Sequence, residues 1–115
     1  MGRTYINTYE DFQIEISSLN IPVVACFYVE WCCQYKKLNN ILKNTLEKNE
    51  CSTIFNINIL NSIKLVKEYN IISSPTVVAF YNKKVFWRES GEVSSEKINR
   101  LKFVLDNVLT TSQLH

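Results

Sequence analysis

The chain has 115 residues, a formal net charge of +2 and an apolar fraction of 46%. This length predicts one domain, large enough to bury a core without disulfide bonds. The small charge and the lack of a basic run argue against nucleic-acid binding, and no apolar stretch is long enough to cross a bilayer. Because no secretory signal is visible at the N-terminus, we expect a cytoplasmic protein whose four cysteines stay mostly reduced.

Strands and helices are expected to alternate along the chain. Short apolar, β-branched runs are typical of strands, whereas apolar residues three and four positions apart are typical of helices. The expected elements are strand 4–7, a helix capped by Asn7 or Thr8, strand 22–29, a helix from about residue 33, strand 52–58, helix 61–69, strand 76–81, a turn at 82–84, strand 85–89 and a helix capped by Ser94 or Ser95. The order β-α-β-α-β-α-β-β-α predicts an α/β fold with a central mixed sheet flanked by helices.

Apolar spacing also predicts which face each helix turns toward the sheet. The inward residues are Phe12, Ile16 and Leu19 in the first helix; Leu38, Ile41, Leu42, Thr45 and Leu46 in the second; Ile63 and Val66 in the third; and Ile98, Leu101, Leu105, Val108 and Leu109 in the last. The uninterrupted apolar run from Pro22 to Val29 is typical of a strand covered on both faces.

The most informative segment runs from Tyr28 to Lys36 and reads Y-V-E-W-C-C-Q-Y-K. It lies where the buried strand is expected to give way to a helix. The segment resembles the active-site turn of the thioredoxin family, W-C-x-x-C-K. Trp31 and Lys36 match that pattern, Cys32 takes the place of the attacking cysteine, and Tyr35 takes the place of the resolving one.

Further landmarks extend the resemblance over nearly the whole chain, as one thioredoxin-like domain of residues 1–115. The run from Val23 to Glu30 resembles the strand that enters the active site, and Gly91 matches the glycine after the last strand. Ser74-Pro75-Thr76 resembles the cis-proline loop, where the family usually has Ile before the proline. The resemblance implies a thioredoxin fold and a substrate groove formed by Ser74, Pro75, Thr76 and Gly91, with Tyr28, Trp31, Ile72 and Ser73 around it.

A trans proline that simply starts a strand is the alternative for Pro75, because its fixed φ suits that position.

Cys32 is the candidate nucleophile. At a helix N-terminus, unpaired backbone N–H groups and the positive end of the helix dipole stabilise a thiolate, which is the form that attacks disulfides. Trp31 is expected to shield one flank of this thiolate. The alternative is a leftover cysteine in a degenerate site, whose pKa would stay near its ordinary value.

The expected site has no cysteine in the resolving position. Cys33 is a weak candidate, because adjacent Cα atoms lie about 3.8 Å apart and disulfides usually need at least about 4.4 Å. Cys26 replaces the buried Asp of thioredoxins, and Asn56 replaces the Lys near it. We expect Cys26 to be a small core residue, with resolution of Cys32 after a local shift as the alternative. Tyr35 either fills the space of the missing cysteine or donates a hydrogen bond toward Cys32.

Two functions remain open from the sequence. The first is a monothiol-type thiol–disulfide oxidoreductase, in which Cys32 attacks a protein disulfide and glutathione or another external thiol resolves the product. The second is a redox-inactive module that docks partner proteins through the cis-proline groove. A glutaredoxin-like iron–sulfur role is disfavoured, because the chain has no Gly-Gly pair for glutathione.

No resident cofactor or metal is expected. The four cysteines lack zinc-finger spacing, Cys51 is expected to be structural, and the single histidine, His115, is the last residue. The expected partners are protein disulfide or thiol substrates, and the chain is expected to be a monomer or a weak dimer.

Overall fold

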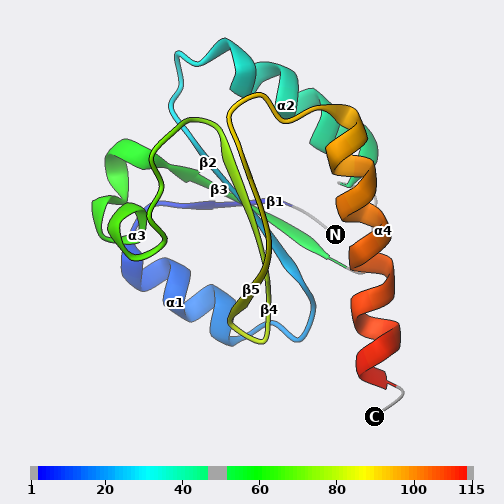
Figure 1. Ribbon diagram of the computed structural model, residues 1–115. Helices are drawn as coiled ribbons and strands as arrows, with labels where there is room; N and C mark the ends of the chain where they lie inside the picture. Colours follow the sequence, from blue (N-terminus) through cyan, green and yellow to red (C-terminus); the bar gives the residue numbers. More distant parts are fainter. Residues whose placement is uncertain (1–2, 47–51, 114–115) are drawn as a thin grey trace.

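The computed structural model describes residues 3–46 and 52–113 (Figure 1). Its elements are β1 (Arg3–Ile6), α1 (Tyr9–Ser17), β2 (Val23–Tyr28), α2 (Cys33–Thr45), β3 (Thr53–Asn58), the 3-10 helix η1 (Ile59–Asn61), α3 (Ile63–Glu68), β4 (Thr76–Tyr81), β5 (Lys84–Ser90) and α4 (Ser95–Gln113). The order expected from the sequence is confirmed, with η1 as an addition. Cys51 and His115 lie outside the described residues.

The strands form one mixed sheet in the order β1-β3-β2-β4-β5. β3 pairs in parallel with β1 and β2, whereas β4 pairs antiparallel with β2 and β5. In the β2–β4 pair, Phe27 lies opposite Thr76. The end of β2 therefore lies beside the beginning of β4. The segment after β2 and the segment before β4 consequently lie at the same end of the sheet.

Helices cover both faces of the sheet (Figure 1). Because side chains alternate along a strand, β2 contributes to two separate cores. Val23, Ala25 and Phe27 pack with α1 and α3, whereas Val24 and Cys26 pack with α2 and α4. The expectation that this strand is covered on both faces is confirmed, since all of its residues are buried.

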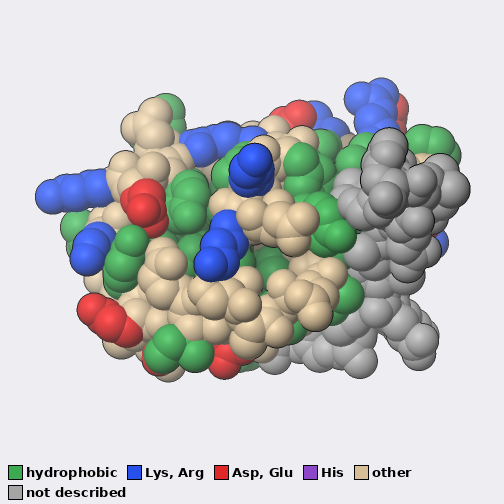
Figure 2. Space-filling model, turned by 90° about the horizontal axis from the view of Figure 1, so that it is seen from below, with side chains coloured by type: hydrophobic (Ala, Val, Ile, Leu, Met, Phe, Trp, Pro, Cys, Tyr) green, Lys and Arg blue, Asp and Glu red, His purple; other side chains and the backbone are tan. Residues whose placement is uncertain are grey.

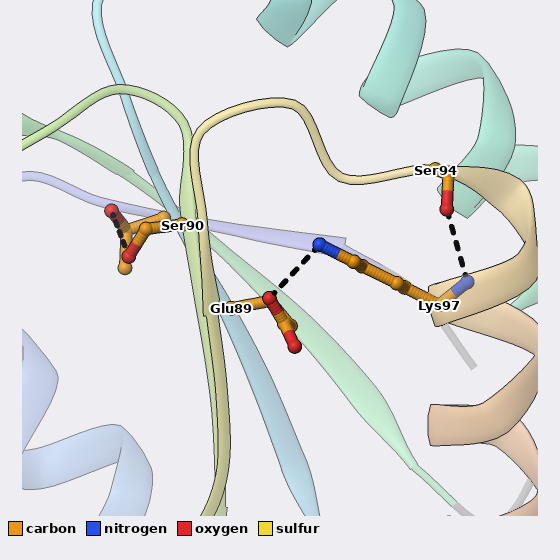
Figure 3. Close-up of polar contacts among 5 residues, drawn as sticks. Glu89, Ser90, Ser94 and Lys97 are labelled. Carbon is orange, nitrogen blue, oxygen red and sulfur yellow. Dashed lines mark hydrogen bonds and ion pairs between the residues drawn. The ribbon is translucent and has the colours of Figure 1, made fainter.

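The first turn of α4 is fixed to the edge of the sheet by polar contacts (Figure 3). Ser94 caps the helix, with its hydroxyl accepting from the Lys97 amide at 3.3 Å. The Lys97 ammonium also lies 3.2 Å from the Glu89 carboxylate of β5. With the two side chains 39% and 35% exposed, this pair contributes at most about 1 kcal/mol. The main attachment of α4 is therefore apolar and comes from Ile98, Leu101 and Leu105, which are fully buried; Val108 and Leu109 have no described side chains.

Two sequence-based boundaries shift slightly. Thr8, rather than Asn7, caps α1 and accepts from the Asp11 amide at 3.0 Å. The β4–β5 turn consists of Asn82 and Lys83, whose positive φ values of 52° and 67° are those of a tight hairpin turn. The third residue expected in that turn, Lys84, consequently belongs to β5.

The inward face of α3 differs from the sequence-based expectation. Ile63 is 51% exposed, and the expectation for it is wrong. Leu65 is fully buried, and Val66 is partly buried against the same core. A helix of six residues makes fewer than two turns, so spacing alone cannot select its inner face. Tyr69, four residues after Leu65, packs against the same core and reinforces the Leu65 side.

The end of the molecule opposite the β2–α2 turn carries positive, negative, apolar and neutral polar side chains in a mixed arrangement (Figure 2). This view shows no continuous basic surface of the kind that nucleic-acid-binding proteins present. Within the described residues, no helix is long and apolar enough to span a membrane.

Replacing Leu65 and Ile63 separately by Ala tests the assignment of the inward face. We expect Leu65→Ala to lower the free energy of unfolding by about 2–5 kcal/mol, because it leaves a cavity in the core. Ile63→Ala should change it by no more than about 0.5 kcal/mol, since it truncates an exposed side chain. Urea unfolding followed by circular dichroism measures both, and equal losses would contradict the assignment.

Candidate active site

The segments that carry the candidate residues meet at one end of the sheet (Figure 1). They are the turn from β2 to α2, the loop before β4 and the loop after β5. Hydrogen bonds join them: the Val29 amide donates to the Ser74 hydroxyl at 3.1 Å, and the Gly91 amide donates to the Pro75 carbonyl at 2.9 Å. The loop before β4 thus lies at the centre of the site.

Cys32 is the N-cap residue of α2 and is partly exposed. Its amide donates to the Val29 carbonyl at 3.2 Å, and its carbonyl accepts from the Lys36 amide at 3.4 Å. Its sulfur lies 3.5 Å from the carbonyl oxygen of Ser74, to which the thiol donates. The sulfur forms no regular capping bond to the helix, so weaker contacts with the first-turn amides must supply the effect of the helix N-terminus.

Several contacts act on the pKa of the Cys32 thiol. Burial raises this pKa, whereas hydrogen bonds from the Tyr35 backbone, the Ser74 side chain and the Gln34 backbone lower it. The lowering effects exceed the effect of burial, and the pKa lies below its ordinary value. A larger fraction of Cys32 is therefore thiolate at neutral pH, as a nucleophile requires.

The Ser74-Pro75 loop opposite Cys32 contains a cis peptide bond. Thr76 is fully buried, and its hydroxyl donates to the Ser73 carbonyl at 2.8 Å, so its side chain supports the loop from inside. Pro75 is also buried. Of the residues assigned to the substrate groove, Ser74 and Gly91 are the ones that remain partly exposed.

Gly91 is required by its backbone conformation. Its φ of +76° lies in the left-handed region, whereas a Cβ built there would meet nothing within 4 Å. Gly91 is therefore favoured at this point of the loop after β5 because of its φ, and not because a side chain would clash with a neighbour.

The Tyr35 ring packs inward from the first turn of α2. It stacks on Tyr28 with centroids 4.1 Å apart and planes 11° apart, and it packs against the core under α2 and α4. That Tyr35 fills the place of the missing cysteine, rather than donating a hydrogen bond toward Cys32, stays a prediction. Tyr28 itself is buried, so the expectation that it forms part of the surface is wrong. Burial, with smaller effects of Tyr5, Glu30 and Cys26, raises the pKa of Tyr28 and keeps its phenol neutral.

The remaining cysteines near the turn lie in different environments. Cys33 is exposed on the first turn of α2, whereas Cys26 is fully buried in the core with Leu38 and Leu42. Asn56 lies opposite Cys26 on β3, is buried, and its side-chain amide has no hydrogen-bond partner among the described residues. These two facing positions on β2 and β3 thus carry a thiol and an amide, as the sequence indicates.

Two large apolar side chains are exposed beside the site. Trp31 is 71% exposed and Ile72 is 84% exposed. Trp31 adjoins Cys32 in the chain, and its shielding of one flank of the thiolate stays a prediction. Lys36 is exposed on α2. Among the described residues, no group of His, Cys, Asp or Glu side chains could hold a metal ion.

The family model described as Thioredoxin matches residues 3–102 of this chain. The chain belongs to the thioredoxin family. Probable thioredoxin-2 of Caenorhabditis elegans is 28% identical over 95 residues, which cover 82% of this chain and 66% of that protein. The thiol:disulfide interchange protein DsbD of Campylobacter jejuni is 24% identical over 101 residues, covering 82% of this chain and 18% of that protein. The chain thus spans less than two thirds of these relatives.

Solved thioredoxin structures support the same fold. The reduced thioredoxin pre-protein of Schistosoma mansoni superimposes with a TM-score of 0.81 at 19% sequence identity, covering 91% of this chain and 99% of that one. The thioredoxin fold expected from the W-C-C-Q-Y-K turn is therefore confirmed.

The lowered pKa of Cys32 predicts a specific pH profile for alkylation. In a Cys33→Ser variant, the reaction of native Cys32 with iodoacetamide should reach half of its maximal rate at a lower pH than in the urea-denatured chain, because the thiolate is the reacting form. The folded pKa is the depressed one. The associated stabilisation is therefore complete above the unfolded pKa and is lost as the pH falls through the folded pKa. Peptide mass spectrometry follows Cys32 alone, and identical midpoints in the two states would contradict the prediction.

Proposed function

We propose that this protein is a monothiol-type thiol–disulfide oxidoreductase with Cys32 as its nucleophile. The observation that carries the proposal is the environment of Cys32, a partly exposed thiol at the start of α2 whose pKa is lowered by nearby hydrogen bonds. Membership of the thioredoxin family supports the general class of reaction.

The proposed reaction begins with attack of the Cys32 thiolate on one sulfur of a protein disulfide. The substrate S–S bond breaks, its second sulfur leaves as a thiolate and takes a proton from water, and Cys32 is held in a mixed disulfide. A glutathione thiolate attacks the Cys32 sulfur of the mixed disulfide, and the substrate sulfur leaves as a thiolate that takes a proton from water. A second glutathione thiolate attacks the glutathione sulfur now bound to Cys32, which releases glutathione disulfide and the Cys32 thiolate. Two glutathione thiols are thereby oxidised to one disulfide while the substrate gains two thiols.

The need for an external thiol follows from the surroundings of Cys32. Tyr35 fills the resolving position and is stacked on Tyr28. Cys26 is fully buried in the core, and adjacent Cys33 is disfavoured as a disulfide partner. No described thiol is thus well suited to close an internal disulfide with Cys32.

The proposed substrates are protein disulfides in extended segments. Such a segment would lie along the loop of Ser74 and use backbone hydrogen bonds, the mode by which strands add to exposed backbone. The exposed side chains of Trp31 and Ile72 provide apolar contact area beside Cys32. The chain would act as a monomer or weak dimer, without a resident cofactor.

A redox-inactive docking module is the second candidate. It is favoured by the combination of a filled resolving position and strongly exposed Trp31 and Ile72. In this case the same surface binds a partner protein, and Cys32 is not consumed.

Insulin reduction with glutathione as electron donor separates the two candidates. We expect slow steady-state turnover by the unmodified chain and loss to the uncatalysed rate in Cys32→Ser, because the mutant lacks the attacking sulfur. The Cys33→Ser variant is the matched control, since it removes the neighbouring exposed thiol and should retain most of the activity. Equal rates for the unmodified chain and Cys32→Ser would favour the docking module.

A second test restores the missing thiol. Tyr35→Cys recreates the C-x-x-C spacing and should allow an internal disulfide with Cys32, detected as a mass lower by two hydrogen atoms after mild oxidation. Loss of the ring stack should lower the free energy of unfolding by about 1–3 kcal/mol. Tyr35→Ala is the control, because it loses the stack without gaining a thiol. Failure of Tyr35→Cys to form the disulfide would show that α2 does not place this position within reach of Cys32.

A further inference from the structure

Arg88 of the edge strand β5 is joined to the end of α3. Its guanidinium donates two hydrogen bonds to backbone carbonyls, one to Tyr69 and one, at 2.6 Å, to Asn70. Arg88 lies opposite Val78 in the β4–β5 pair, and Val78 belongs to the core that α1 and α3 cover. Because paired residues face the same side of a sheet, Arg88 is placed on the side of α3.

The end of α3 is shaped by its own backbone bonds. Asn70 has a φ of 52°, in the left-handed region. The Ile71 amide donates to the Val66 carbonyl at 2.9 Å, and both side chains belong to the same core. The Asn70 amide donates to the Lys67 carbonyl at 3.3 Å. These bonds form a Schellman motif, which turns the chain out of the helix and into the loop before β4.

Arg88 binds two carbonyls further along the chain than those used by this motif. The guanidinium suits the carbonyls of Tyr69 and Asn70 because its N–H donors form a rigid fork. Tyr69 is also anchored by its ring, which packs edge-on against Phe12 and Phe80. Asn70 is exposed, so the position of its backbone depends more on the bond from Arg88.

The end of β5 also holds the far side of the same loop. The Gly91 amide donates to the Pro75 carbonyl at 2.9 Å, and the Thr76 hydroxyl donates to the Ser90 hydroxyl at 3.5 Å. Residues 71–74 therefore lie between two attachments to one segment, residues 88–91. That segment is in turn fixed by the pairing of β5 with β4.

We propose that Arg88 is a positioning residue for the substrate groove: by binding the end of α3, it fixes the loop that presents Ile72 and Ser74 to an extended substrate segment. Ile72 is 84% exposed, so its place is set by the backbone on either side rather than by packing. A loop that is fixed in advance binds more tightly, because less conformational entropy is lost on binding. This inference rests on the proposed function for the identity of the bound segment.

The proposal makes a distinction between the groove and the nucleophile. Arg88 is not among the contacts that shift the pKa of Cys32. Its loss should therefore weaken reaction with a peptide disulfide that lies along the loop, while reaction with a small disulfide stays the same.

The chain offers a matched control in Arg100 of α4. Its guanidinium is also exposed and donates to Glu96 at 2.8 Å, but this pair lies within one helix, at a spacing of four residues. Arg88→Met and Arg100→Met each remove the charged head and keep an unbranched apolar stem. Arg88→Lys keeps the charge but donates from a single nitrogen, without the fork.

The first measurement is amide hydrogen exchange, followed by nuclear magnetic resonance, with unfolding curves to verify that each variant is folded. We expect Arg88→Met to speed exchange of the Asn70 and Ile71 amides roughly three- to tenfold, because the motif that protects them is held less firmly. Arg88→Lys should lie between Arg88→Met and the unmodified chain. Exchange within β2 and β3 should not change, and Arg100→Met should behave as the unmodified chain.

The second measurement is a single-turnover reaction in the Cys33→Ser background. The probes are a heptapeptide whose central cysteine is a pyridyl disulfide and dithiodipyridine, which has no peptide. The Cys32 thiolate attacks the peptide sulfur, pyridinethione leaves and is followed by its absorbance, and the peptide stays on Cys32 as a mixed disulfide. We expect Arg88→Met to slow the peptide reaction roughly three- to tenfold and to change the dithiodipyridine reaction by less than about twofold.

Unchanged exchange at Asn70 and Ile71, or faster exchange throughout the sheet, would overturn the proposal. Equal slowing with both probes would also overturn it, since this indicates an altered Cys32 rather than an altered groove, and so would a peptide rate that does not depend on Arg88. Insulin reduction is decided separately. An Arg88-dependent peptide rate without steady-state turnover would support the positioning role and refute the oxidoreductase, whereas turnover with an Arg88-independent peptide rate would do the reverse.

Discussion

The antiparallel pairing of β2 with β4 is the constraint on which the site depends. Because Phe27 lies opposite Thr76, the chain leaving β2 and the chain entering β4 are forced together. Ser74 then reaches the turn, where its hydroxyl accepts from Val29 and its carbonyl accepts from Cys32. The environment of the nucleophile is thus created by segments more than 40 positions apart in sequence.

The residues around Cys32 that differ from the thioredoxin pattern are consistent with one another. Tyr35 replaces a thiol with a ring that stacks on Tyr28, and the layer beneath contains Cys26 and Asn56 in place of a carboxylate and an ammonium. Burying a charge is costly unless it is paired and hydrogen-bonded. Because position 35 is a tyrosine, a buried carboxylate would carry that cost with no thiol at this position to deprotonate. The site therefore has the helix N-terminus and the cis-proline loop beside Cys32, with no buried carboxylate or ammonium at positions 26 and 56.

The sequence predicted the elements that local rules control. The apolar run that became β2 and the long repeat of α4 were both identified, because many residues agree on one periodicity. The inner face of α3 was not identified correctly. In a helix of fewer than two turns, spacing alone does not decide whether Ile63 or Leu65 faces the core. Tyr28 was expected at the surface, but it is buried and stacks on Tyr35. Tyr28 ends a strand and Tyr35 lies in the following helix, and the periodicity of a single strand or helix does not predict a contact across the turn between them.

The sequence by itself determined the family, the place of Cys32 at the start of a helix and the absence of a cysteine at position 35, because these follow from residue identity and spacing. Tertiary structure decided how the cysteines differ: Cys26 is buried in the core, Cys33 faces solvent, and Cys32 has its pKa lowered. It also decided that the Ser74 hydroxyl is held by the Val29 amide. Burial and hydrogen bonding between distant segments are properties of the packed sheet, and no local pattern of residues encodes them.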